Sequence, residues 1–326
     1  MQDQTRPRRF SALAAAAAAL AAQAHAGEPA HFLYSGDSNE EEIRSLLKGS
    51  DIEGVQVIYS WRRLEPRKGE YDFSAIERDL AALDALGKKL FIQIQDRFFQ
   101  TEARNIPDYL LDDPHYGGGL VAQIDNPGEN LPKQQGWVSA QWNPALRARF
   151  QALLAALGDQ FDGRIYGINL PESSADIDQK ADDTGFTCDA YFEASLENIQ
   201  AARNAFEKSH VVQYTNFWPC EWNNDKGYMG RIFEDAAAKG YGLGGPDIVP
   251  HRRAQMKNSY PFFNAYKDRL PIIAMAIQEP TLTYRNPETG KRFTREEFVE
   301  FASGYLGVDV IFWTTRAPWL RETKED

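Results

Sequence analysis

Short apolar runs that favour β-structure alternate with amphipathic segments along almost the whole chain. The apolar runs span residues 31–36, 54–61, 89–95, 164–170, 211–217, 241–249, 271–277 and 308–313. Apolar residues recur at helical spacing over residues 39–48, 72–86, 143–161, 189–208, 228–239, 255–267 and 294–306. Continuous apolar runs suit strands that are covered on both faces, and their alternation with helices implies parallel βαβ units.

Eight such units in about 300 residues favour the α/β class and a (β/α)8 TIM barrel, with an open doubly wound sheet as the second choice. Only 13 residues follow Trp313, so we expect the last helix to be short or missing. The pattern predicts a single (β/α)8 catalytic domain over residues 27–326. It predicts no particular oligomeric state.

The first 26 residues have the features of a secretory signal peptide. Three arginines make a basic start, residues 10–22 are apolar and rich in alanine, and Ala24-His25-Ala26 fits the small-x-small cleavage pattern. The apolar stretch is too short for a stable membrane span. We therefore predict cleavage after Ala26 and a periplasmic or secreted protein.

The chain is acidic, with 47 acidic and 36 basic residues and a formal net charge of −11. Such a surface argues against nucleic acid or an anionic membrane as a partner and favours a neutral or weakly charged ligand. The histidines show no metal-ligand spacing, so we expect no metal and no cofactor. Cys188 and Cys220 lie in adjacent predicted βα loops and are a candidate disulfide for an exported protein.

Residues 100–142 interrupt the alternation with a long stretch rich in proline, glycine, asparagine and aspartate. Trp137 and Trp142 lie within it, and its aromatic content favours an ordered excursion. A long loop in a compact domain is commonly functional, so we expect this one to wall a cleft.

Two glutamates follow predicted strands at the end of a barrel where active sites form. Glu172 comes after the fourth strand and Glu279 after the seventh, each next to a proline. In a barrel these strands lie on opposite sides of the mouth. Two carboxylates that face each other across a cleft suit glycoside hydrolysis, because one donates a proton while the other attacks or activates water. The alternative is that two of 47 acidic residues fall at strand ends by chance.

Further polar and aromatic side chains fall at the predicted strand ends and are candidates for substrate binding. Asp247 is the rival nucleophile or an orienting group; otherwise it caps a turn. Asp96 can contact ligand or form a salt bridge with Arg97, and Tyr214 can hydrogen-bond a nucleophilic carboxylate or pack at the rim. The complete set of predicted substrate-binding residues is Trp61, Asp96, Asn169, Tyr214, Asn216, Asp247, His251 and Trp313.

The segment Tyr59-Ser-Trp-Arg-Arg-Leu-Glu-Pro-Arg-Lys-Gly-Glu-Tyr-Asp-Phe-Ser74 resembles the second-strand signature of clan A glycoside hydrolases. These are retaining (β/α)8 enzymes with an acid/base glutamate after strand four and a nucleophilic glutamate after strand seven. The resemblance implies that Glu172 is the acid/base and Glu279 the nucleophile. It also implies that Trp313 forms the floor of the −1 sugar site.

The clan usually has an asparagine directly before the acid/base glutamate, where this chain has Pro171. The nearest asparagine is Asn169, which is the candidate for the contact to the sugar 2-hydroxyl. Together these observations predict an exported retaining glycoside hydrolase that acts on an oligo- or polysaccharide. The alternative is a non-catalytic glycan-binding protein on the same barrel.

Overall fold

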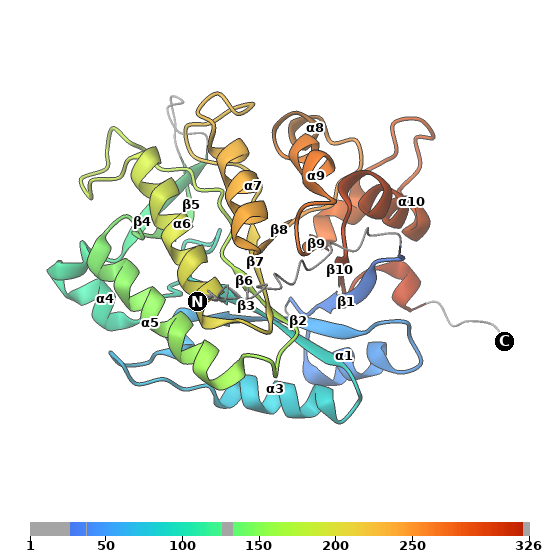
Figure 1. Ribbon diagram of the computed structural model, residues 1–326, viewed down its shortest axis with the longest axis horizontal. Coiled ribbons are helices and arrows are strands. Elements are labelled where there is room, and N and C mark those ends of the chain that lie inside the picture. Colours follow the sequence, from blue (N-terminus) through green and yellow to red (C-terminus); the bar gives the residue numbers. More distant parts are fainter. Residues whose placement is uncertain (1–26, 37, 126–132, 322–326) are drawn as a thin grey trace, which may run out of the picture.

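The computed structural model describes residues 27–36, 38–125 and 133–321, so the predicted leader lies outside the described residues. Eight parallel strands close into a barrel in the order β1-β10-β9-β8-β7-β6-β3-β2 (Figure 1). The strands are β1 (Ala30–Tyr34), β2 (Gly54–Ser60), β3 (Lys89–Gln95), β6 (Gly167–Leu170), β7 (His210–Tyr214), β8 (Gly242–Gly245), β9 (Ile273–Ile277) and β10 (Val310–Thr314). The predicted (β/α)8 barrel is therefore confirmed, and pairing of β1 with β10 excludes the open sheet.

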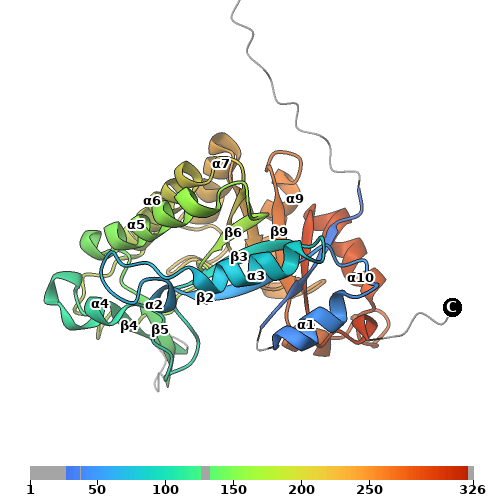
Figure 2. The ribbon, with the colours of Figure 1, turned by 90° about the horizontal axis from the view of Figure 1, so that it is seen from below.

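The helices that follow the strands cover the outside of this barrel (Figures 1 and 2). They are α1 (Glu40–Leu47), α3 (Ser74–Asp84), α5 (Pro144–Phe161), α6 (Cys188–Ala205), α7 (Tyr228–Lys239), α8 (Arg253–Asn258), α9 (Tyr260–Tyr266) and α10 (Arg295–Glu300). After β10, the described chain has only the single turn η4 (Pro318–Leu320), as expected for a short last helix. None of the described helices is both long and apolar enough to cross a bilayer.

Two predicted helices differ in detail from the structure. The segment 255–267 is divided into α8 and α9, because Pro261, the second residue of α9, cannot donate a backbone hydrogen bond to α8. The segment 294–306 starts as α10 behind a Thr294 capping box and continues as a π-helix over Phe301–Leu306.

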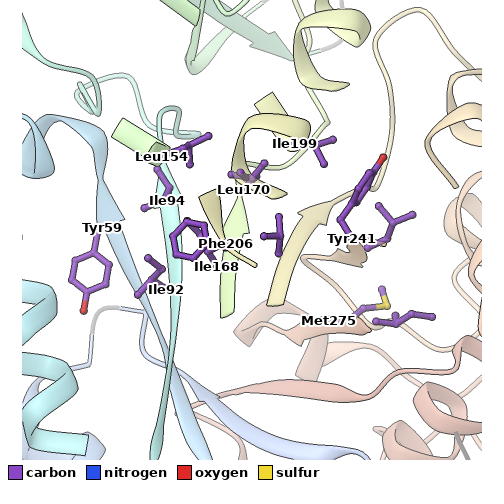
Figure 3. Close-up of a cluster of buried hydrophobic side chains, with 14 of the residues drawn as sticks. Tyr59, Ile92, Ile94, Leu154, Ile168, Leu170, Ile199, Phe206, Tyr241 and Met275 are labelled. Atoms are coloured by element: carbon purple, nitrogen blue, oxygen red, sulfur yellow. The ribbon is translucent and has the colours of Figure 1, made fainter. Parts of the chain in front are cut away.

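Alternate side chains of each strand point into the barrel and out towards the helices. Phe32, Phe91, Val212, Ala276 and Phe312 belong to the cluster inside the barrel. The side chains between them belong to a larger cluster that packs against the helices, part of which Figure 3 shows. This alternation decides which residues at the strand ends can face the mouth, meaning the carboxyl ends of the eight strands.

The excursion at 100–142 contains a hairpin of β4 (Leu120–Asp125) and β5 (Lys133–Ser139), next to α4 (Asp108–Asp112) in Figure 2. Its residue Trp137 donates a hydrogen bond to the Thr101 carbonyl over 2.8 Å, and the Arg104 guanidinium lies 4.0 Å from the Trp137 ring centroid. The described part of the excursion is thus ordered, in agreement with its aromatic content.

The Glu65 carboxylate joins the segment after β2 to α5 and to the excursion. It is completely buried and accepts hydrogen bonds from Trp61 Nε1 (2.8 Å), the Gly69 backbone N–H (2.8 Å) and the Tyr109 hydroxyl (3.0 Å). Arg149 of α5 completes the set with a salt bridge. Buried charges require such compensation, so these donors fix the chain around the carboxylate.

Replacing Arg149 with methionine is expected to leave the buried Glu65 charge without its counter-ion. Breaking a buried pair in this way costs about 3–5 kcal/mol of unfolding free energy, measurable by urea denaturation. The matched control is Arg164→Met, which breaks an exposed pair with Glu77 and should cost less than about 1 kcal/mol. Equal losses in the two variants would contradict the structural role assigned to Glu65.

Candidate active site at the carboxyl ends of the strands

Glu172 lies at the mouth, two residues after the end of β6, and its neighbour Ser173 fixes its position. The Ser173 N–H donates to the Tyr214 carbonyl (2.9 Å), and its hydroxyl donates to the Phe217 carbonyl (2.8 Å). Glu172 as a whole residue is half-buried, and its carboxylate accepts a hydrogen bond from Asn216 Nδ2 at 3.1 Å. The carboxylate is therefore held between the ends of β6 and β7.

The surroundings of Glu172 raise the pKa of its carboxyl to about 7. Loss of hydration is the main cause, and the charge of Asp247 adds to it, while Asn216 and Arg97 act in the opposite direction. A carboxyl with a pKa near neutrality can remain protonated and donate its proton, as a general acid must.

Asp247 follows β8 and Pro246 and is held from two sides. Its carboxylate accepts a hydrogen bond from the Thr281 hydroxyl at 3.2 Å, and its carbonyl accepts one from Tyr260 at 2.8 Å. Burial raises the pKa of the Asp247 carboxyl, against the opposing effects of Thr281 and Arg252. The Asp247 charge also contributes to the raised pKa of Glu172, so the two carboxyls interact electrostatically.

Glu279 is the first residue of the 3-10 turn η2 (Glu279–Thr283), and its side chain is exposed. Its side chain forms no hydrogen bond or salt bridge with another described residue. Ala274 and Ala276 of β9 face the barrel interior, but β9 ends at Ile277, so the strand does not fix the direction of the Glu279 side chain. In this conformation Asp247, rather than Glu279, acts on Glu172.

Three polar side chains form a buried layer directly beneath the mouth. Gln56 Nε2 donates to Asn169 Oδ1 (3.1 Å) and to the Tyr214 hydroxyl (2.9 Å). Asn169 Nδ2 and Gln56 Oε1 have no hydrogen-bond partner among the described residues. The Tyr214 hydroxyl accepts its hydrogen bond from Gln56, so its O–H remains able to donate, and its predicted role towards a nucleophilic carboxylate stays a prediction.

The two tryptophans expected at the site lie on the outer side of the barrel. Trp61 is fully buried, packs edge-on against Phe150 at 5.2 Å and donates to Glu65. Trp313 is also fully buried and donates through Nε1 to His31 Nδ1 at 3.0 Å. Assigning either residue as a sugar platform is therefore wrong for this structure, because both rings are fully buried in the layer between the barrel and the helices.

Asp96 follows β3 directly and is 1% exposed, and with Arg97 it lines a small cavity that Glu172 also lines. It accepts hydrogen bonds from Arg97 Nε and Gln141 Nε2, each at 3.0 Å, and from the Ser139 hydroxyl. The prediction that Asp96 contacts the ligand is therefore wrong for this structure. The alternative prediction, a salt bridge between Asp96 and Arg97, is confirmed.

A groove of about 550 Å³ lies beside the mouth, between the loops that follow β7, β8 and β9. The residues that line this rim groove are Trp222, Val249, Pro250, His251, Arg252, Arg253, Ala254, Lys257, Tyr284, Arg285, Pro287 and Phe293. His251 was expected at the site and has a positive φ of 61°, which is uncommon for a residue other than glycine. Its neighbour Arg252 is, like His251, a candidate from the sequence for hydrogen bonds to sugar hydroxyls or a carboxylate, whereas Arg253, Lys257 and Arg285 of the lining are not predicted from the sequence.

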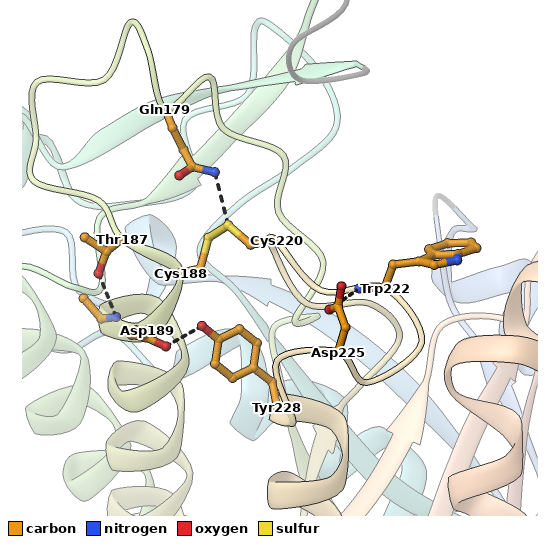
Figure 4. Close-up of a disulfide and its surroundings, with 9 residues drawn as sticks. Gln179, Thr187, Cys188, Asp189, Cys220, Trp222, Asp225 and Tyr228 are labelled. Carbon is orange, nitrogen blue, oxygen red and sulfur yellow. Dashed lines mark hydrogen bonds between the residues drawn. A yellow bond between two sulfur atoms is a disulfide. The ribbon is translucent and has the colours of Figure 1, made fainter.

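Cys188, the first residue of α6, forms a disulfide with Cys220 in the loop after β7, with 6.2 Å between their Cα atoms (Figure 4). Gln179 Nε2 donates a hydrogen bond to Cys220 Sγ at 3.1 Å. Trp222 follows Cys220 by two residues and projects away from the disulfide (Figure 4). The covalent link thus anchors the loop that forms one wall of the rim groove.

Comparisons with solved structures establish the fold of the chain. The catalytic domain of β-amylase from Paenibacillus polymyxa is 8% identical, with a TM-score of 0.57 over 88% of this chain and 92% of that one. β-Galactosidase from Bacillus circulans sp. alkalophilus is 10% identical, with a TM-score of 0.56 over 88% and 50%. A psychrophilic family 10 endo-β-1,4-xylanase is 14% identical, with a TM-score of 0.51 over 88% and 86%.

No protein-family model matches the chain, and no curated protein matches it. At identities this low the likeness shows that the chain has the barrel fold found in these glycoside hydrolases. The likeness does not show that the chain has the activity of any of these enzymes.

The electrostatic contact predicts how the pKa of Glu172 responds to its neighbours. Asp247→Asn removes a negative charge and should lower the pKa of Glu172 from about 7, whereas Asn216→Ala removes a donor to the ionised form and should raise it. Carbon-13 NMR titration of labelled glutamate carboxyls measures both shifts. The exposed Asp84→Asn variant is the control and should leave this pKa unchanged; an unchanged value in Asp247→Asn would contradict the contact.

Loss of the disulfide is expected to reduce stability. Cys188 and Cys220 are 32 residues apart, and by chain entropy a closed loop of this size contributes about 3–4 kcal/mol. Denaturant unfolding of Cys188→Ser/Cys220→Ser beside the oxidised parent measures the loss. A variant as stable as the parent would show that this link does not constrain the unfolded chain.

Proposed function

We propose that this protein is a glycoside hydrolase in which Glu172 protonates the glycosidic oxygen of the leaving group. The observation that carries the proposal is the pair of carboxyls at the mouth, one of which has a pKa of about 7. Glycoside hydrolysis requires one carboxyl that is protonated and a second that is ionised.

Asp247 is the second carboxyl that the geometry supports best. When Glu172 is protonated, Asp247 no longer faces a like charge, and Thr281 and Arg252 favour its ionised form against the opposing effect of burial. It then either attacks the anomeric carbon or activates a water molecule. Glu279 occupies the position that the resemblance to clan A implies, and it becomes the nucleophile only if η2 turns its side chain towards the mouth.

The polar layer beneath the mouth supports the binding of a hydroxyl-rich ligand. Asn169 Nδ2 is a free donor and Gln56 Oε1 a free acceptor among the described residues, and both are buried. Unpaired buried polar groups carry a desolvation cost that a hydrogen-bonding ligand relieves. We further propose that the protein is exported, on the basis of its leader sequence, and acts on an oligo- or polysaccharide outside the cytoplasm.

Three substitutions separate the candidate roles. Glu172→Gln should lower kcat by about 10²–10⁴-fold, because it removes the proton donor. An aryl glycoside with a good leaving group should restore much of this rate, because its departure needs little protonation. Asp247→Asn is expected to abolish turnover and Glu279→Gln to leave it nearly intact. The reverse pattern would assign the nucleophile to Glu279.

The exposed Glu207→Gln variant, at the opposite end of the barrel, is the control and should keep the parent rate. The anomer first formed, observed by proton NMR, distinguishes retention from inversion and hence the carboxyl separation. Parent-like rates in all three variants would refute the catalytic proposal. Saccharide binding without turnover would indicate the glycan-binding alternative.

A further inference from the structure

The rim groove is basic, in contrast to the chain as a whole. Arg252, Arg253, Lys257 and Arg285 line it together with His251, and the described residues place no acidic side chain on its lining. The whole chain has a net charge of −11. The groove is therefore a local reversal of the charge of the molecule.

The four charged residues of the groove are not paired in salt bridges with other described residues, although Arg252 interacts electrostatically with Asp247. None of them forms a salt bridge within the described residues, whereas several arginines elsewhere on the surface, such as Arg164 and Arg231, pair with glutamates. Arg253 and Lys257 lie one turn apart on α8, a spacing at which like charges repel. An anionic ligand in the groove would compensate this repulsion.

Aromatic rings lie among these cations. The Trp222 side chain is 50% exposed and stacks parallel to Phe217, with 6.3 Å between ring centroids. Lys257 Nζ lies 5.6 Å from the Trp222 centroid, and the Arg252 guanidinium lies 4.6 Å from that of Tyr284. An exposed aromatic face next to a cation matches a sugar ring that carries an anionic substituent.

The groove is continuous in sequence with the candidate catalytic groups. Asp247 and the basic segment 251–253 belong to the loop after β8, and Thr281, which holds Asp247, leads to Tyr284 and Arg285 after β9. The loops after β8 and β9 therefore carry both Asp247 with its partner Thr281 and most of the groove lining.

We propose that the rim groove is a subsite for a negatively charged saccharide, so that the substrate is an acidic glycan. This inference rests on the proposed function and adds the substrate class to it. The shared ligand chemistry is an anionic group on a sugar ring, either a uronate carboxylate or a sulfate ester. This inference replaces the prediction of a neutral or weakly charged glycan. That prediction was based on the net charge of the whole chain and not on how the charges are distributed over the surface.

The test measures binding separately from turnover. Isothermal calorimetry on the Glu172→Gln protein compares tetrasaccharides that are neutral, uronate-bearing or sulfated. We expect at least one charged class to bind about tenfold more tightly than the neutral one, with an affinity that falls as salt is added. The two charged probes identify which anionic group the groove prefers.

Arg253→Gln/Lys257→Gln in the same background should remove most of this preference and of its salt dependence. The matched control is Arg269→Gln, an exposed arginine 4.3 Å from the Tyr266 ring centroid at the opposite end of the barrel, which should leave binding unchanged. Thermal unfolding of the double variant should show no loss of stability, because its change relieves a repulsion.

Equal affinity for neutral and charged probes, no binding of any charged probe, or an unchanged preference in the double variant would overturn the inference. Hydrolysis of neutral glycans together with such a result leaves the proposed function intact. Tight binding of a charged probe without hydrolysis by the parent protein refutes the proposed function and retains the subsite.

Discussion

The buried Glu65 carboxylate is the interaction on which the mouth of this barrel depends. Its donors come from the segment after β2, from the excursion and from α5, so a single charged group joins three parts of the chain. Residues 59–74 resemble the clan A signature, and here Trp61 and Glu65 have a structural role. The resemblance in this segment therefore supports the fold more directly than the chemistry.

The alternation of apolar runs and helices was sufficient to predict the eight barrel strands and the short chain end after β10. It was also sufficient to place Glu172 at the mouth. The errors at Trp61, Asp96 and Trp313 have one cause. A sequence pattern locates a strand end only within a residue or two, whereas consecutive side chains point to opposite faces. An error of one residue therefore assigns a side chain to the mouth when it packs against the helices.

The basic groove was missed for a different reason. Its cations come from the loops after β8 and β9, and nothing in the spacing of either segment shows that they meet. The same applies to Asp247 and Glu172, whose contact depends on how two loops bend beyond their strands. Loop geometry at the mouth therefore sets the chemistry, while the strands provide the frame that the sequence pattern predicts.

Because of the disulfide, the shape of the rim groove depends on the redox conditions around the protein. The loop that carries Trp222 is tied to α6 through Cys188 and Cys220, and hydrogen bonds such as that from Tyr228 to Asp189 assist it. In reducing surroundings the two sulfurs are separate thiols, and only the weaker contacts remain. One wall of the groove is thus fully anchored only after oxidation, which couples maturation of the ligand-binding surface to the redox state of the compartment.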